Sequence, residues 1–218
     1  MADLEIHRAS YGSLRLPGAD AVAVEFFTDD ISSNDPGHAS FDERAISHVE
    51  LRYDETDTTA IRRGMRLNRL PRGLWPWVRD EAPAHLLAAL PPGLDLIDSS
   101  DAEIDAAWDD LSAALAGFIA PAAGARRRLA VATKIMHLKR PRLVPILDRN
   151  VLSVLGLHLA DDASHAKQIE MGLTAAALIR REGRRNREPL AVVEESLRAA
   201  DLERSPNRIL DGLLWLAY

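Results

Sequence analysis

The chain has 218 residues, of which 28% are charged, with a net charge of −6 and no cysteine. This length suits one domain or two small lobes with a substantial core. The absence of cysteine excludes disulfides, thiolate catalysis and cysteine-based metal sites. No run of about eighteen consecutive apolar residues occurs, so no membrane span is expected. The acidic N-terminus does not match a signal peptide, and a cytoplasmic protein is predicted.

The first 60 residues predict short strands and loops. "AVAVEFF" (21–27) is an apolar, β-branched and aromatic run between turn sequences, and "AISHVELRYD" (45–54) alternates apolar and polar residues. Both indicate strands. "PRGLWPWVRD" (71–80) contains two prolines and a glycine, and is expected to form a loop that holds Trp75 and Trp77. The chain is therefore divided into a β-containing part, residues 1–60, and a helical part, residues 61–218.

Helical signals dominate the second part, so the predicted fold class is mainly α. Ser100 followed by Glu103 is a capping box that opens an amphipathic helix. A further helix is expected from about Leu129 to Pro141, and three more follow to the C-terminus. Their expected boundaries are the N-caps Ser164 and Ser205 and the stop Gly183.

The charges are distributed unevenly along the chain. Residues 2–60 hold thirteen acidic and four basic side chains, whereas residues 121–149 hold eight basic side chains and a single acid, Asp148. Because local clustering sets the potential that a polyanion meets, residues 121–149 predict a nucleic-acid contact. A second basic run, "IRREGRRNRE" (179–188), is explained equally well by solvated helix ends.

Residues 132–156 carry the most specific pattern. A helix containing Ala132 and Thr133 ends before Pro141, an apolar segment follows, and Asp148 stands where an N-cap is expected for a helix that ends at Gly156. Capping by itself would account for Asp148.

This order resembles the C-terminal half of the helix–hairpin–helix motif of DNA glycosylases, over about residues 110–160. "PILDRNVL" (145–152) is especially similar to the archaeal 8-oxoguanine glycosylases. The whole chain also resembles an actinobacterial family of unknown function, through "ATKIMHLKRPRLVPILDRNV" and the C-terminal "RILDGLLW". In that last stretch, Asp211 is expected to pair with an arginine from across the structure.

The glycosylase resemblance implies a helix–hairpin–helix glycosylase-like domain that binds double-stranded DNA, including damaged duplexes, and needs no cofactor or metal. The enzyme would be a monofunctional DNA N-glycosylase. Asp148 would be the catalytic carboxylate that assists cleavage of the N-glycosidic bond of a flipped base. Trp75 and Trp77 would stack on the base, although tryptophans beside prolines more often anchor packing.

Two positions depart from the motif. The glycine hairpin falls near Arg126–Arg128, and the nucleophilic lysine of the bifunctional enzymes aligns with Ala130. Lys134, one helical turn further on, is the substitute that the sequence offers as a Schiff-base lysine. The predicted nucleic-acid contacts are Arg126, Arg127, Arg128, Lys139, Arg140, Arg142 and Arg149.

Two alternatives stay open at this point. In one, the fold is glycosylase-like but catalytically inactive, and the chain is a nucleic-acid or protein-binding module. In the other, the basic segment docks an acidic partner, such as the acidic N-terminal half of another copy.

Overall fold

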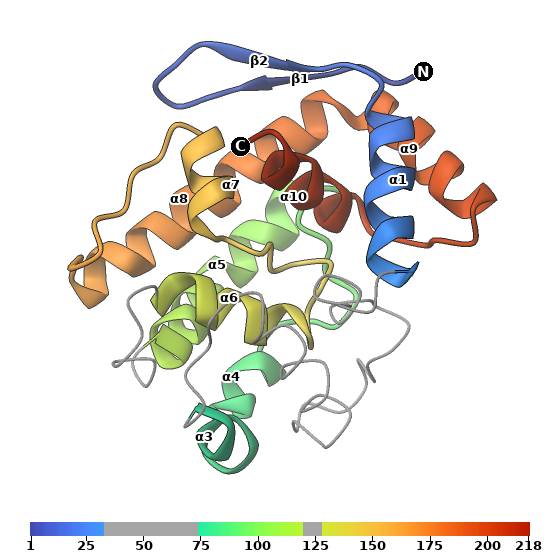
Figure 1. The fold of residues 1–218 in the computed structure, drawn as a ribbon. Coiled ribbons are helices and arrows are strands. Elements are labelled where there is room, and N and C mark those ends of the chain that lie inside the picture. The colour runs from blue at the N-terminus through green and yellow to red at the C-terminus, as the bar shows by residue number, and fades with distance from the viewer. Residues whose placement is uncertain (33–73, 120–127) are drawn as a thin grey trace.

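The computed structural model describes residues 1–32, 74–119 and 128–218. These residues are mainly helical, with one antiparallel two-stranded sheet near the N-terminus, as predicted (Figure 1). The strands are β1 (Leu4–His7) and β2 (Ser13–Leu16). The helices are α1 (Ala19–Ser32), α3 (Leu74–Asp80), α4 (Ala84–Ala88), α5 (Asp101–Ile119), α6 (Arg128–His137), α7 (Arg149–Val154), α8 (His165–Arg185), α9 (Arg187–Ala199) and α10 (Pro206–Leu216).

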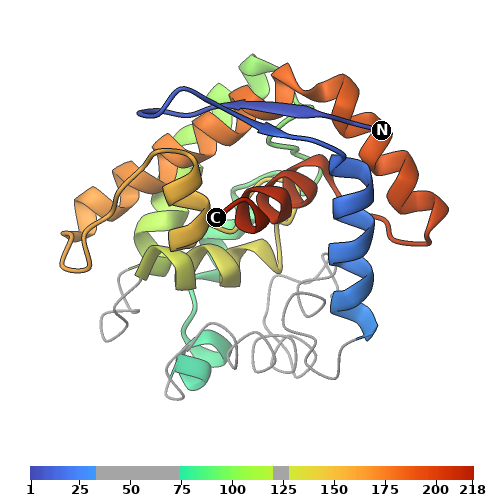
Figure 2. The ribbon, with the colours of Figure 1, turned by 45° about the horizontal axis from the view of Figure 1, so that its top comes forward.

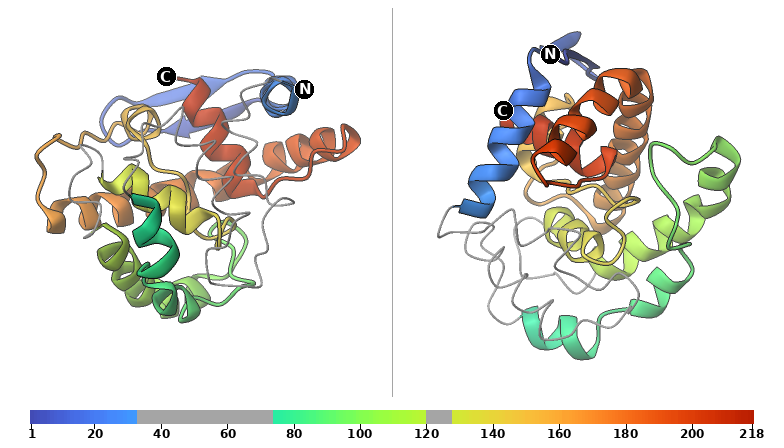
Figure 3. Two further views of the ribbon diagram at one scale, coloured as in Figure 1. Left: turned by 60° about the horizontal axis from the view of Figure 1, so that its bottom comes forward. Right: turned by 90° about the vertical axis from the view of Figure 1, so that its right-hand side faces the viewer.

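Helix α10 lies in the centre of the molecule. It packs against α1, α7, α8 and α9, and its residues 206–214 are all buried (Figures 1 and 2). Ser205 caps it by accepting the N–H of Arg208, and Pro206 stands in the first turn, where a missing N–H costs nothing. Helices α5 and α6 also pack against α8. Helices α3 and α4 lie at the end of the molecule away from the hairpin (Figure 3).

Strand β1 is attached to α8 by side chains that replace a neighbouring strand. The N–H of Glu5 donates to Oδ1 of Asn186 at 2.8 Å, and Nδ2 of Asn186 donates to the carbonyl of Glu5 at 2.9 Å. One turn earlier on α8, Glu182 accepts the N–H of His7 at 2.8 Å. These bonds satisfy the outer edge of β1, which would otherwise be open to pairing with another chain.

Two predicted elements were wrong. Residues 21–27 belong to helix α1 and not to a strand, because Ala19, Ala23 and Phe27 recur every four residues and form one buried helical face. Residues 74–80 form helix α3 and not a loop, since Pro76 lies in the first turn, where its missing N–H needs no acceptor. The predicted strand 45–54 lies outside the described residues.

The predicted helix starts are confirmed, and one predicted stop is wrong. Ser100 and Glu103 form the expected capping box, with the Ser100 N–H donating to Glu103 Oε2 at 2.8 Å and the Glu103 N–H donating to Ser100 Oγ at 3.3 Å. Ser164 caps α8 through the N–H of Lys167. Helix α8, however, continues past Gly183 to Arg185, and Gly183 provides room for Ile97 against the helix. Within the described ranges, no helix combines the length and the apolar character that crossing a membrane requires.

Candidate functional site

Asp148 is the N-cap of α7, as predicted. Its backbone is extended, and Oδ1 accepts the N–H groups of Asn150 and Val151 at 3.0 and 3.1 Å. The side chain is half-buried. The second carboxylate oxygen, Oδ2, accepts no hydrogen bond from the described part of the chain. One oxygen of Asp148 therefore serves the helix, and the other is available for chemistry or for a ligand.

The backbone before Asp148 is held by two neighbouring helices. The N–H of Leu147 donates to Oγ1 of Thr133 on α6 at 3.1 Å, and that hydroxyl donates to the carbonyl of Leu129 at 3.0 Å. The N–H of Ile146 donates to Oδ2 of Asp211 on α10 at 3.2 Å. Three successive residues, 146–148, are thus anchored to α10, α6 and α7 in turn.

A cavity of about 350 Å³ is lined by the residues before and after Asp148, and this volume lies in the range of small-molecule sites. Asp148 itself is not among the lining residues, but Leu147 and Arg149 are. The apolar part of the wall consists of Leu129, Ala130, Leu147, Leu152, Leu157, Leu159 and Ala160. The polar part consists of Arg149, Ser153, His158, Asp161, Gln168 and Tyr218.

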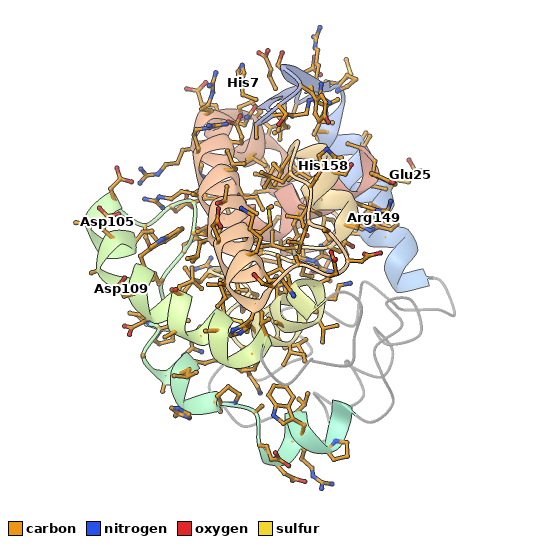
Figure 4. All side chains as sticks on the ribbon, turned by 90° about the vertical axis from the view of Figure 1, so that its left-hand side faces the viewer. His7, Glu25, Asp105, Asp109, Arg149 and His158 are labelled. Atoms are coloured by element: carbon orange, nitrogen blue, oxygen red, sulfur yellow. The ribbon has the colours of Figure 1, made fainter. Side chains whose placement is uncertain are left out.

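Some polar side chains of the cavity wall make hydrogen bonds within the fold, and others are available to a ligand. Both polar atoms of the Gln168 side chain make hydrogen bonds within the fold: Oε1 accepts the N–H of Leu129, and Nε2 donates to the carbonyl of Ala163. His158 shares a 2.9 Å hydrogen bond with the hydroxyl of Tyr11 in the hairpin. Arg149 is exposed and forms no ion pair with the described residues, and its guanidinium projects from the start of α7 on the same side of the molecule as His158 (Figure 4). Among its described lining residues, the cavity therefore combines an apolar wall with the available cation of Arg149.

The prediction that residues 121–149 present their cations to a nucleic acid was wrong for three of them, on α6 and in the turn that follows it. Lys134, Lys139 and Arg140 are only 5%, 2% and 5% exposed. Arg140 donates to the carbonyls of Leu87 and Leu90 at 2.9 and 3.1 Å, which ties the turn after α6 to the end of α4. Burial removes Lys139 and Arg140 from the surface that a nucleic acid would touch. Lys134 lies one turn beyond Ala130 and, unlike Ala130, does not line the cavity.

The other predicted nucleic-acid contacts divide into two groups. Arg126 and Arg127 lie outside the described residues, and Arg128 begins α6 with a side chain that is not described. Arg142 and Arg149 are exposed, and Arg142 has only a long 3.9 Å contact with Asp95. The basic surface that is seen is therefore smaller than the sequence predicted.

The predicted stacking surface is not seen at Trp77. Its ring packs edge-on against Phe118 with the ring centres 6.1 Å apart, so Trp77 anchors α3 to α5. The side chain of Trp75 lies outside the described part of the chain.

The second basic run has a structural role. Arg180 donates to the carbonyls of Leu96 and Ser99, and Arg184 donates to those of Ile97 and Ser99. Both arginines also bind Asp101, and together they hold the turn that leads into α5.

Asp211 pairs locally and not across the structure. Its partner is Arg208, one turn earlier on α10, and both side chains are almost completely buried. Burial raises the pKa of Asp211 to about 6, although Arg208 and the Ile146 N–H oppose this shift. The negative charge of Asp148 adds to the increase in pKa. The bond to Ile146 was missed, and the only sequence signal for it is a charge inside the apolar stretch "RILDGLL".

The match to a protein family covers the helical part of the chain. The family is described as "Family of unknown function (DUF6308)", and it matches residues 74–217. The chain belongs to this family. The matched region contains Asp148, the cavity and the Arg208–Asp211 pair, whereas the hairpin lies before it. No curated protein and no solved structure matches the chain.

Proposed function

We propose that the chain is a DNA-binding protein of the base-excision type, with Asp148 as the carboxylate that assists loss of a flipped base. The observation that carries this proposal is the state of Asp148: one oxygen caps α7, and Oδ2 accepts no hydrogen bond from the described residues beside a cavity of about 350 Å³. Positive charge develops on the sugar as the base leaves with the electron pair of the N-glycosidic bond, and a carboxylate fixed next to it would stabilise that charge. Water would then add to the sugar carbon, and its proton would be passed on to the departing base. The apolar wall would receive the base, and Arg149 would contact a phosphate.

The test is release of a base from DNA by the full chain, with Asp148→Asn as the variant. Asn is as good an N-cap as Asp, so this change removes the charge and keeps the helix start. We expect the rate of base release from duplexes containing 8-oxoguanine, uracil or an alkylated purine to fall by roughly 100-fold or more. Asp109→Asn is the matched control, because it removes one exposed carboxylate from α5, which contributes no residue to the cavity wall. Equal rates in Asp148→Asn and the wild type would refute the catalytic role.

A second function is supported by a different observation. Capping accounts for Asp148 without catalysis, and Asp148 is not among the residues that line the cavity. The chain would then be a glycosylase-like module that binds nucleic acid without cleaving it. In this case no duplex loses a base, but fluorescence anisotropy still detects salt-dependent binding. Arg149→Gln should then lower the slope of log K against log salt by about one unit. A protein that shows no binding at low salt would contradict both functions.

A further inference from the structure

The centre of the molecule contains a buried ion pair on α10. Arg208 and Asp211 on α10 have side chains that are 3% and 2% exposed, in a helix whose residues 206–214 are all buried. Removing two charges from water is expensive, and apolar residues of similar volume are often as stable or more so. The pair therefore calls for an explanation other than stability.

Every polar contact of Asp211 points to a positioning role. Oδ1 accepts from Nη1 of Arg208, and Oδ2 accepts the N–H of Ile146 at 3.2 Å. The guanidinium of Arg208 lies over the ring of Phe27, 5.1 Å from its centre, so α1 holds the cation from the side. Asp211 is thus fixed by Arg208 on one side and fixes Ile146 on the other.

Ile146 lies two residues before Asp148, and the residue between them is held as well. The N–H of Leu147 donates to Thr133, so each residue between Ile146 and the start of α7 has a hydrogen bond that fixes its position. Loss of the Asp211 bond would leave the N–H of Ile146 buried without an acceptor, and the segment would have to move to satisfy it. The place of Asp148 at the edge of the cavity therefore depends on Asp211.

We propose that Asp211, aligned by Arg208, is a positioning residue that holds the 146–148 backbone and thereby places the Asp148 carboxylate beside the cavity. The consequence for base release rests on the proposed function, whereas the placement of the backbone does not. Asp211 need not contact a substrate, because its action passes through the N–H of Ile146.

The test compares two double variants of the full chain by amide hydrogen exchange. Asp211→Leu/Arg208→Met removes both charges and the acceptor, and Asp211→Asn/Arg208→Met removes both charges but keeps an acceptor oxygen. We expect exchange at Ile146 to become about ten-fold faster or more in the Leu variant, since a lost buried hydrogen bond has at least this effect. In the Asn variant, exchange should return to within a few-fold of the wild type. Ala176 in the core of α8 is the reference amide and should change in neither variant.

The outcomes separate the two proposals. Equal exchange at Ile146 in the Leu variant and the wild type would overturn the positioning role, whatever the chain does to DNA. Faster exchange with unchanged base release would also overturn it, because Asp148 would then be placed without Asp211. Faster exchange together with loss of base release in the Leu variant, and recovery of both in the Asn variant, is the expected result.

If the wild type releases no base, the proposed function fails, and exchange at Ile146 alone decides whether Asp211 holds the segment. Should the Leu variant not fold, Asp211→Ala/Arg208→Met makes the same comparison.

Discussion

At the scale of the residue, two neighbouring carboxylates have different environments. Asp148 is half-buried at a helix N-terminus and has one oxygen that accepts no hydrogen bond from the described residues. Asp211 is buried, and both of its oxygens are bonded. Burial raises the pKa of Asp211 from 3.8 to about 6, with Arg208 opposing the increase. The difference assigns the two carboxylates different tasks: Asp148 is available to a ligand, and Asp211 holds the backbone.

The raised pKa of Asp211 predicts a pH dependence of stability with a definite sign. Between pH 4 and pH 6 the folded state keeps a proton on Asp211 that the unfolded state has lost. The contribution of this group to the free energy of unfolding is therefore fully present below about pH 4 and is lost as the pH rises through 6. Urea unfolding of the wild type and of Asp211→Asn at pH 4 and pH 7 measures it. The wild type should lose stability relative to the variant on going to pH 7, and a difference that does not change with pH would contradict the prediction.

At the scale of the element, arginines on α8 hold the turn that precedes α5. The guanidinium of Arg180 is nearly buried and binds the carbonyls of Leu96 and Ser99 as well as Asp101. Arg184 repeats this pattern one turn later. Long arginine side chains suit this task because one planar group can bind several carbonyls at once. The basic run in the sequence thus serves the fold through Arg180 and Arg184, whereas Arg181 and Arg185 are exposed.

Removal of one such arginine should destabilise the fold. Arg180→Ala leaves the carbonyls of Leu96 and Ser99 without their donor, and we expect the free energy of unfolding to fall by about 1–3 kcal/mol. Arg185→Ala is the matched control on the same helix, since Arg185 is exposed and makes only a 3.4 Å contact with His7. Its effect should stay within about 0.5 kcal/mol. Urea unfolding of both variants checks the prediction. Equal losses in the free energy of unfolding would show that the bonds from Arg180 to the turn before α5 do not stabilise the fold specifically.

At the scale of the whole molecule, the N-terminal hairpin closes over helices that are distant in sequence. Its tip is tied to the end of α7, where the N–H of Ala9 donates to the carbonyl of Leu155 at 2.8 Å and the Ser10 hydroxyl donates to that of Gly156 at 2.9 Å. Gly156 has a φ of +77°, and a Cβ at that position would lie 2.8 Å from the backbone nitrogen of Ser10. Glycine is therefore needed there for both conformation and space.

Two glycine substitutions separate these causes. Gly12 also has a positive φ, +71°, but a Cβ there would meet nothing within 4 Å. Gly12→Ala should cost only the strain of a left-handed alanine, about 1–2 kcal/mol. Gly156→Ala should cost about 1–3 kcal/mol more, because the hairpin tip must move away. Thermal unfolding and exchange at the Ala9 amide measure the two effects, and equal losses from both variants would exclude the clash.

Features that depend on neighbours within one helical turn could be predicted from the residues alone. The N-caps Ser100, Asp148, Ser164 and Ser205 were correctly predicted, because each side chain bonds an N–H two or three residues away. The long helices α5, α8, α9 and α10 followed from apolar periodicity for the same reason.

Interactions between distant segments became visible only in the folded protein. It placed residues 21–27 in a helix and buried Lys139 and Arg140, although nothing local marks those cations as internal. It joined Asp211 to Ile146, 65 positions away, and built the cavity from residues between Leu129 and Tyr218. Local hydrogen bonds and periodicity can be read along the chain, whereas burial and pairing across the core depend on how the helices pack.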